Sequence, residues 1–101
     1  MTQFLAPFFS ALFLFNAIPH LVQGICGKRH MTPFARSSGP ATNVIWAWIN
    51  RLIGLWLLKA SNPAGWQFSA WAAFCAGGVV ISLSLAIFWA KPDARLPWHR
   101  K

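Results

Sequence analysis

Five polar side chains stand inside otherwise apolar stretches of this sequence, and their types suit ligand binding better than bond making. An imidazole can accept or donate a hydrogen bond or bind a metal, amides donate and accept, and a guanidinium holds anions. In hydrocarbon such groups are costly unless they meet one another or a ligand, so they mark helix contacts or binding sites. The candidate cluster consists of Asn16, His20, Asn50, Arg51 and Ser84.

The sequence lacks the side chains and motifs on which enzymes usually rely for catalysis. The one acidic residue, Asp93, follows the last apolar stretch, so the cluster has no carboxylate to act as an acid or base. The sequence contains neither a nucleophile motif nor a phosphate-binding loop. We therefore expect a protein that is not an enzyme, with no catalytic residue, no metal site and no cofactor.

Three long apolar stretches must position the cluster. Hydrophobic residues make up 56% and charged residues 10% of the 101 residues, a balance typical of membrane proteins. As helices, stretches of this length cross about 30 Å of hydrocarbon, although the second is slightly short. The sequence predicts an all-α membrane protein with three transmembrane helices in a single domain. The expected spans cover residues 4–26, 44–60 and 66–90, with a basic loop at 27–43 and a basic tail at 91–101.

The first two spans each have a competing interpretation. Residues 4–26 could be a secretory signal peptide, but the three residues before them carry no basic side chain, which favours a permanent span. Residues 44–60 are interrupted by Arg51 and could lie along the interface as an amphipathic helix. The apolar residues surround that helix instead of covering one face, which favours a span.

Lysine and arginine residues set the expected orientation, because cytoplasmic loops of membrane proteins are enriched in them. With the N-terminus outside and the C-terminus cytoplasmic, seven basic residues fall on the cytoplasmic side and Lys59 falls near the outer side. We expect a multi-pass protein of the bacterial inner membrane. The seven residues are Lys28, Arg29, Arg36, Lys91, Arg95, Arg100 and Lys101.

The net charge of +8 does not predict nucleic-acid binding. The basic residues flank apolar stretches and form no basic helix face, so their pattern indicates topological signals and attraction to anionic lipid headgroups. We expect membrane lipids as partners and no nucleic acid.

The five candidate residues converge on one level of the expected membrane. At 1.5 Å per residue from the cytoplasmic end of each helix, His20 lies about 9 Å deep and Asn16 about 15 Å deep. Asn50 and Arg51 lie about 9 to 11 Å deep, and Ser84 lies about 9 Å deep. The expected arrangement is a compact three-helix bundle with one inner polar cluster.

Two residues of the cluster keep several interpretations. Arg51 has no carboxylate at its depth, so its counter-ion is a lipid phosphate, an acidic partner subunit, or an anionic or carbonyl-bearing ligand. His20 could bond another helix, donate its N–H to a quinone carbonyl, or ligate a haem or a pigment. Pro19 frees the carbonyl of Phe15, for which Asn50 or Arg51 is the expected donor.

Turn and cap residues set the expected ends of the second helix. The pattern S-G-P at 38–40 indicates a turn, and Thr42 or Asn43 could cap the helix that follows. Segment 61–65 contains both Pro and Gly and predicts a tight connection, so the second and third helices should form an antiparallel hairpin.

Four short motifs in the N-terminal half carry a resemblance. They are N-x-x-P-H at 16–20, G-x-x-G at 24–27, T-P-F at 32–34 and N-x-x-W at 43–46. In these motifs the chain resembles a group of small uncharacterised bacterial inner-membrane proteins. The resemblance implies a bacterial membrane protein, and it implies no activity, substrate or catalytic residue.

Two functions fit this sequence. The favoured one is a non-enzymatic accessory or assembly subunit of a membrane complex, whose partner is another membrane protein subunit or a second copy of the chain. Small size and the unmatched charge of Arg51 motivate this interpretation. The alternative is a quinone or lipid binder, or a component of a small transporter, in which Asn16, His20, Asn50 and Arg51 line the site.

Overall fold

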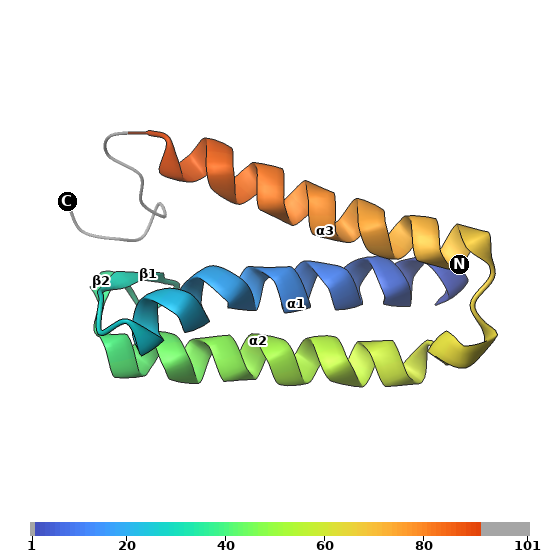
Figure 1. The fold of residues 1–101 in the computed structure, drawn as a ribbon, viewed down its shortest axis with the longest axis horizontal. Coiled ribbons are helices and arrows are strands. Elements are labelled where there is room, and N and C mark those ends of the chain that lie inside the picture. Colours follow the sequence, from blue (N-terminus) through green and yellow to red (C-terminus); the bar gives the residue numbers. More distant parts are fainter. Residues whose placement is uncertain (1, 92–101) are drawn as a thin grey trace.

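The computed structural model describes residues 2–91 and is mostly helical (Figure 1). The expected basic tail lies outside the described residues, apart from Lys91. The elements in chain order are α1 (Thr2–Ile25), β1 (His30–Thr32), β2 (Ala35–Ser38), α2 (Pro40–Ala60), the 3-10 helix η1 (Pro63–Gly65) and α3 (Phe68–Trp89).

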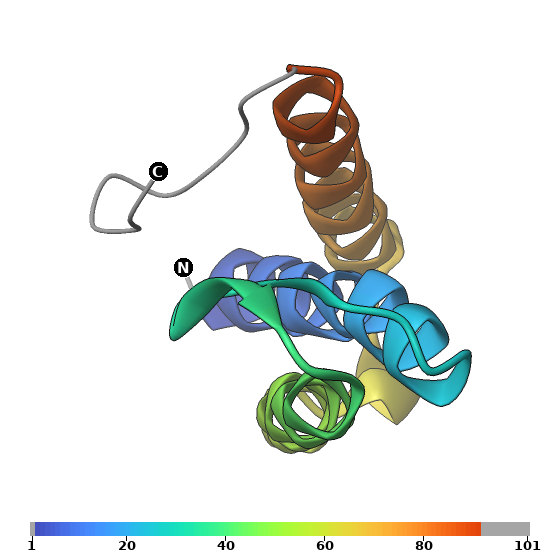
Figure 2. The ribbon, with the colours of Figure 1, turned by 90° about the vertical axis from the view of Figure 1, so that its left-hand side faces the viewer.

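Helix α1 lies between the two other long helices. Figure 2 looks along the helices and shows α2 and α3 on different sides of α1. Both extensive helix interfaces are formed by α1, one with α2 and one with α3. The expectation of a compact bundle is therefore wrong, since α2 and α3 run antiparallel without packing along each other.

Small residues bring α1 and α2 together along their whole length. A side chain at Gly54 would collide with Leu14, and one at Gly24 would collide with Val44. The Ser10 hydroxyl donates to the Gly54 carbonyl at 2.8 Å. These contacts hold α2 alongside α1 from the Gly24–Val44 contact to the Ser10–Gly54 bond.

Helix α3 meets α1 closely at one end and leaves it at the other. A side chain at Gly77 would collide with the backbone carbonyl of Phe8, so glycine permits this contact. Figure 1 shows α3 diverging from α1 toward the end of the molecule that carries β1 and β2. The buried residues of α3 are few and small: Ala70, Gly77 and Gly78.

The second helix begins four residues earlier than expected. Gly39 is the N-cap and Pro40 is the first helical residue, where its fixed φ and missing N–H suit a helix start. The expectation of a cap at Thr42 or Asn43 is therefore wrong. Asn43 is instead fully buried inside the first turns of α2.

Segment 27–43, expected to be a plain loop, contains an antiparallel hairpin of β1 and β2. Helix α1 ends at Ile25, and Gly27 follows it with a φ of 72°, a conformation that favours glycine. The hydroxyls of Thr32 and Ser38 lie 2.6 Å apart across the hairpin, and the backbone N–H of Phe34 donates to the Thr32 hydroxyl. These bonds fold the hairpin back over the ends of the helices.

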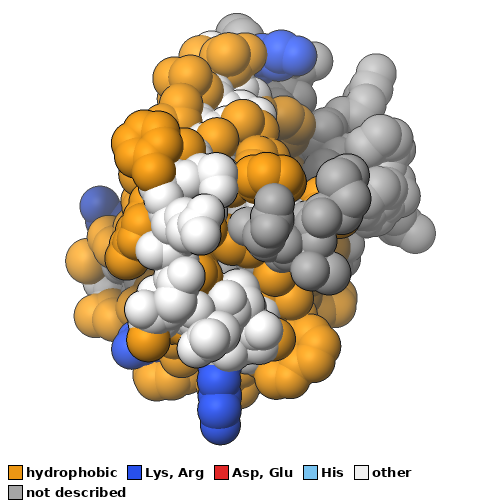
Figure 3. Space-filling model, turned by 90° about the vertical axis from the view of Figure 1, so that its right-hand side faces the viewer, with side chains coloured by type: hydrophobic (Ala, Val, Ile, Leu, Met, Phe, Trp, Pro, Cys, Tyr) orange, Lys and Arg blue, Asp and Glu red, His pale blue; other side chains and the backbone are white. Residues whose placement is uncertain are grey.

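The connection between α2 and α3 is tight, as expected. Asn62 adopts a left-handed conformation, and the indole N–H of Trp66 donates to the carbonyl and hydroxyl oxygens of Ser61. Because Trp66 holds this extended turn, α3 begins at Phe68 and not at residue 66. Figure 3 views this end and shows hydrophobic side chains around its periphery.

Two helices are long and apolar enough to cross a membrane, over Phe4–Ile25 of α1 and Phe68–Trp89 of α3. Only 11% of the α3 segment is buried. The core helix of a soluble protein would be mostly covered, whereas α3 exposes Val79, Leu83 and Ile87. These features suggest a membrane protein. Helix α2 contains several polar residues and is not among the helices that are apolar enough to cross a membrane by composition alone.

Candidate functional site

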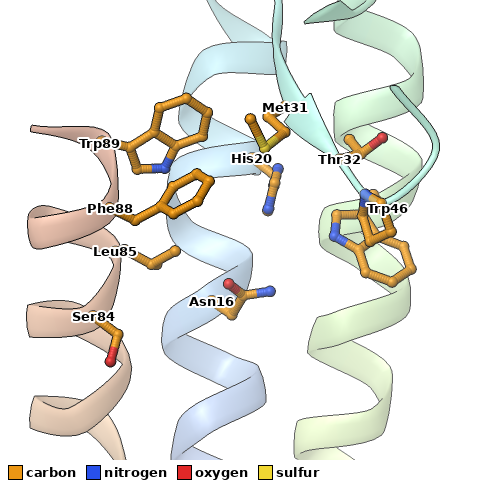
Figure 4. A pocket seen from close by; sticks show the side chains of 10 residues that line it. Asn16, His20, Met31, Thr32, Trp46, Ser84, Leu85, Phe88 and Trp89 are labelled. Atoms are coloured by element: carbon orange, nitrogen blue, oxygen red, sulfur yellow. The ribbon is translucent and has the colours of Figure 1, made fainter. Parts of the chain in front are cut away.

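A cavity of about 300 Å³ lies where α3 diverges from α1, beneath the hairpin of β1 and β2. We call it the hairpin pocket, and Figure 4 shows the residues that surround it. From α1 and the hairpin come Asn16, His20, Met31, Thr32 and Pro33. From α2 and α3 come Trp46, Ser84, Leu85, Phe88 and Trp89.

Asn43 organises the polar network behind the pocket. Its amide nitrogen lies 3.0 Å from each of three backbone carbonyls, those of His30, Ser38 and Gly39. Its amide oxygen lies 2.9 Å from Nδ1 of His20. Because carbonyls only accept, the nitrogen must face them and the oxygen must face His20. One buried side chain thus joins α1, the hairpin and the start of α2.

This network sets the tautomer of His20. The Asn43 oxygen can only accept, so the proton of the neutral ring is on Nδ1 and a lone pair is on Nε2. Within residues 2–91, Nε2 makes no hydrogen bond and is not enclosed, so it is open to the cavity. Figure 4 shows a ring nitrogen of His20 directed toward Asn16. His20 offers the pocket an acceptor, not the N–H that a quinone carbonyl would need.

Asn16 and Asn50 link α1 to α2 one turn deeper. The amide nitrogen of Asn16 donates to the amide oxygen of Asn50 at 3.1 Å. The amide nitrogen of Asn50 donates to the Trp46 carbonyl at 2.9 Å. The expected acceptor for Asn50 was the Phe15 carbonyl that Pro19 frees. Asn50 instead donates to the Trp46 carbonyl. The amide oxygen of Asn16 is left as a second acceptor beside the pocket.

Aromatic rings cover the pocket at its hairpin side. The ring of His30 lies 5.1 Å from that of His20 and 4.4 Å from that of Trp89, between centroids. Nε2 of His30 is enclosed and has no hydrogen-bond partner in the described part of the chain. Burial lowers the pKa of His30 below 6.5, and the charge of the nearby His20 lowers it further. His30, which lies in the segment expected to be a basic loop, therefore contacts two residues of the pocket, His20 and Trp89.

The structure brings together some of the expected cluster and separates the rest. Asn16, His20 and Asn50 share the α1–α2 seam, whereas Ser84 stands on the far wall of the pocket. Arg51 lies outside the cluster: it is exposed, and its guanidinium carbon is 4.8 Å from the centre of the Trp48 ring. Successive helix residues point about 100° apart, so when Asn50 faces α1 its neighbour cannot.

Sequence reasoning missed the residue that holds the site together. Asn43, Ala47, Asn50 and Gly54 are all buried and follow the spacing of one helix face. This spacing is visible in the sequence. Asn43 was assigned to the end of the loop, however, and was therefore not counted with the other residues of the helix face. The aromatic wall from α3 had no comparable signal, because that helix is apolar on every side.

Comparisons of the chain with protein-family models, with curated proteins and with solved structures find no match. Several residues of the four short motifs lie at the hairpin pocket, while Gly24 and Gly27 do not. Asn16, His20, Thr32 and Trp46 all line the hairpin pocket, and Asn43 holds two of its walls. The site must therefore be interpreted from its own chemistry.

Proposed function

We propose that the chain is a membrane-embedded binding protein that holds an amphipathic, lipid-soluble ligand in the hairpin pocket. The observation that carries this proposal is the pocket itself, which combines unpaired polar atoms of α1 with aromatic rings of α2 and α3. Ligand sites typically pair apolar walls with a few placed polar groups.

We infer from the basic residues at the hairpin end that this pocket lies near one membrane surface. Helices α1 and α3 are long and apolar enough to cross a membrane. Because α2 packs along α1, we expect α2 to cross the membrane with them. The hairpin end carries Lys28, Arg29, Arg36 and Lys91, whereas Lys59 lies at the opposite end of α2. Basic residues favour the cytoplasmic side, which puts the pocket at the cytoplasmic boundary of the bacterial inner membrane and the N-terminus outside.

This position suits a ligand with a polar head and an apolar tail. The polar atoms of Asn16 and His20 lie on the wall formed by α1, while Leu85 and Phe88 of α3 add apolar side chains to the lining of the pocket. A head group can reach the polar wall as its tail stays among lipid chains. The same geometry offers little to a fully water-soluble molecule.

Filling the pocket tests the proposal. Leu85 lines the cavity, whereas Ile87 is exposed on the outer face of α3, so Leu85→Trp and Ile87→Trp form a matched pair. The full chain would be purified in mild detergent and its bound amphiphiles extracted and quantified by mass spectrometry. We expect a ligand retained by the wild type and Ile87→Trp and lost from Leu85→Trp. Equal retention in both variants would contradict the proposal.

A second function, that of an accessory subunit, is favoured by the position of Arg51. It lies about 16 Å along α2 from Pro40 and about 14 Å from Ala60, and it points outward. No acidic residue occurs in residues 2–91, so a membrane-crossing α2 needs an outside counter-ion for it. An acidic residue in a span of another subunit would serve.

Size and stoichiometry in detergent test this second function. Light scattering with protein mass spectrometry would compare the wild type with Arg51→Leu and with Leu52→Ala, an exposed neighbour. A stoichiometric partner that is lost only from Arg51→Leu would support the subunit function. A wild type that purifies alone as one monodisperse species would argue against it.

A further inference from the structure

We propose that the hairpin pocket selects a ligand whose head is a hydroxylated aromatic ring, such as a phenol or a quinol carrying an apolar tail. This inference rests on the proposed function and adds the chemistry of the head group. The feature behind it is a pair of hydrogen-bond acceptors, on His20 and Asn16, that face the cavity without donors.

The acceptor on His20 follows from the bonds of Asn43. Three carbonyls fix the Asn43 amide nitrogen, its oxygen takes the Nδ1 proton of His20, and Nε2 keeps a lone pair. Asn43 is fully buried, and rotating its amide would set its oxygen against the carbonyl oxygens of His30 and Ser38, so the pattern cannot be reversed. The tautomer of His20 is therefore built into the fold.

The acceptor on Asn16 lies one helical turn away on the same face of α1. One N–H of its amide nitrogen bonds Asn50, which turns the nitrogen toward α2 and leaves the oxygen as an acceptor. Within the described residues, no donor bonds either this oxygen or Nε2 of His20. The hydroxyl of Thr32 does not serve, because it bonds Ser38, whose own proton goes to a carbonyl. The ligand must bring the donor.

Charge narrows the choice of donor. Lys28, Arg29, Arg36 and Lys91 surround this end of the helices, and no acidic residue occurs in residues 2–91. A cationic ammonium head would be repelled there and would also lose its hydration. A neutral hydroxyl donates its proton without that cost, and its oxygen can accept from the indole N–H of Trp46 or Trp89.

The walls favour an aromatic ring as the carrier of the hydroxyl. Trp46, Phe88 and Trp89 present three rings to the cavity, and aromatic pairs attract beyond the area they bury. Cavities of about 150 Å³ accept a benzene ring, so the 300 Å³ here holds a substituted ring and the start of its tail.

Three probes of similar length test the inference on the purified full chain in detergent. They are 4-nonylphenol, its methyl ether 4-nonylanisole, and the aliphatic alcohol 1-dodecanol. Affinities would come from the rise of the melting temperature with probe concentration. Leu85→Trp, the milder Leu85→Phe and the outer-face control Ile87→Trp would separate binding in the pocket from uptake into the micelle.

We expect the wild type and Ile87→Trp to bind the phenol about tenfold more tightly than the methyl ether, since one donated hydrogen bond is lost. Equal binding of the two, blocked by filling at Leu85, would overturn the hydroxyl inference and leave the proposed function standing. Tighter binding of dodecanol would overturn the aromatic ring. Binding that both filled variants retain, or no binding to the wild type, would overturn the inference and the site with it.

Discussion

Nδ1 of His20 and the amide oxygen of Asn43 lie 2.9 Å apart, and this contact joins α1 to α2 at the point where the hairpin folds back. The same Asn43 side chain binds the carbonyls of His30, Ser38 and Gly39. A single amide therefore positions both the backbone that covers the pocket and the imidazole that faces it. We therefore expect Asn43 to affect both the stability of the chain and the ligand binding that we propose for this pocket.

Replacing Asn43 should be among the most damaging single changes. Asn43→Leu removes the acceptor of the His20 proton and the two amide N–H groups that face the backbone carbonyls, so we expect a loss of about 3 kcal/mol of unfolding free energy. Unfolding in mixed micelles with increasing denaturing detergent would measure it. Thr42→Ala, at an exposed neighbouring position, serves as the control and should change little. Similar small losses in both variants would show that Asn43 is not the centre of the network.

The approach of α3 to α1 should depend on Gly77. Gly77→Ala places a methyl group against the backbone carbonyl of Phe8, which cannot move without shifting a helix, so we expect a loss of about 1 to 3 kcal/mol. Gly78→Ala meets the ring of Phe15 at 3.1 Å, and that side chain can turn away. In thermal unfolding, the melting temperature of Gly77→Ala should therefore be lower than that of Gly78→Ala. A lower melting temperature for Gly78→Ala would indicate that the closest contact between α1 and α3 is not at Gly77.

The bond between Asn16 and Asn50 should contribute modestly, as bonds between membrane helices do. A double-mutant cycle of Asn16→Leu and Asn50→Leu should give a coupling free energy of about 0.6 kcal/mol. The chain should still fold in the double variant, because Ser10 and Asn43 hold the same seam. Additive single effects would indicate that the two amides are not bonded.

His30 should make stability depend on pH. Its pKa is lowered in the folded chain by burial and by His20, so the unfolded chain takes up the proton first as the pH falls. Its contribution to stability is complete above pH 6.5, the ordinary value, and is lost as the pH falls below it. We expect the melting temperature to drop between pH 7.5 and 5.5.

His30→Phe isolates this effect. The variant keeps a ring against His20 and Trp89 and removes the enclosed Nε2, which has no hydrogen-bond partner among residues 2–91. It should be at least as stable as the wild type at pH 7.5 and should lose less stability on acidification. An unchanged pH dependence would assign the titration to another group, with His20 the nearest.

The sequence predicted the helices well and their arrangement less well. Long apolar stretches decide where helices form, so the three helices lie close to the expected ranges. Arrangement depends on a few contacts that hydropathy does not report. Gly77 places α3 on one side of α1, and no comparable contact holds α3 against α2.

Within the site, residue type was a better guide than depth. Depth placed Asn50 and Arg51 together, but their neighbouring positions turn them to different faces of α2. The seam residues Asn16, His20 and Asn50 were recognisable because helix spacing puts them on inward faces. The hairpin could not be recognised in the sequence, because its bonds come from Thr32 and Ser38 in a segment without strand periodicity.

The amount of amphiphile that remains bound per protein molecule, compared between Leu85→Trp and Ile87→Trp, tests the central claim most directly. Both variants add the same side chain to α3, and only the first adds it inside the hairpin pocket. The account predicts near wild-type retention for Ile87→Trp and loss of the bound molecule from Leu85→Trp. The same retention by two folded variants would contradict it.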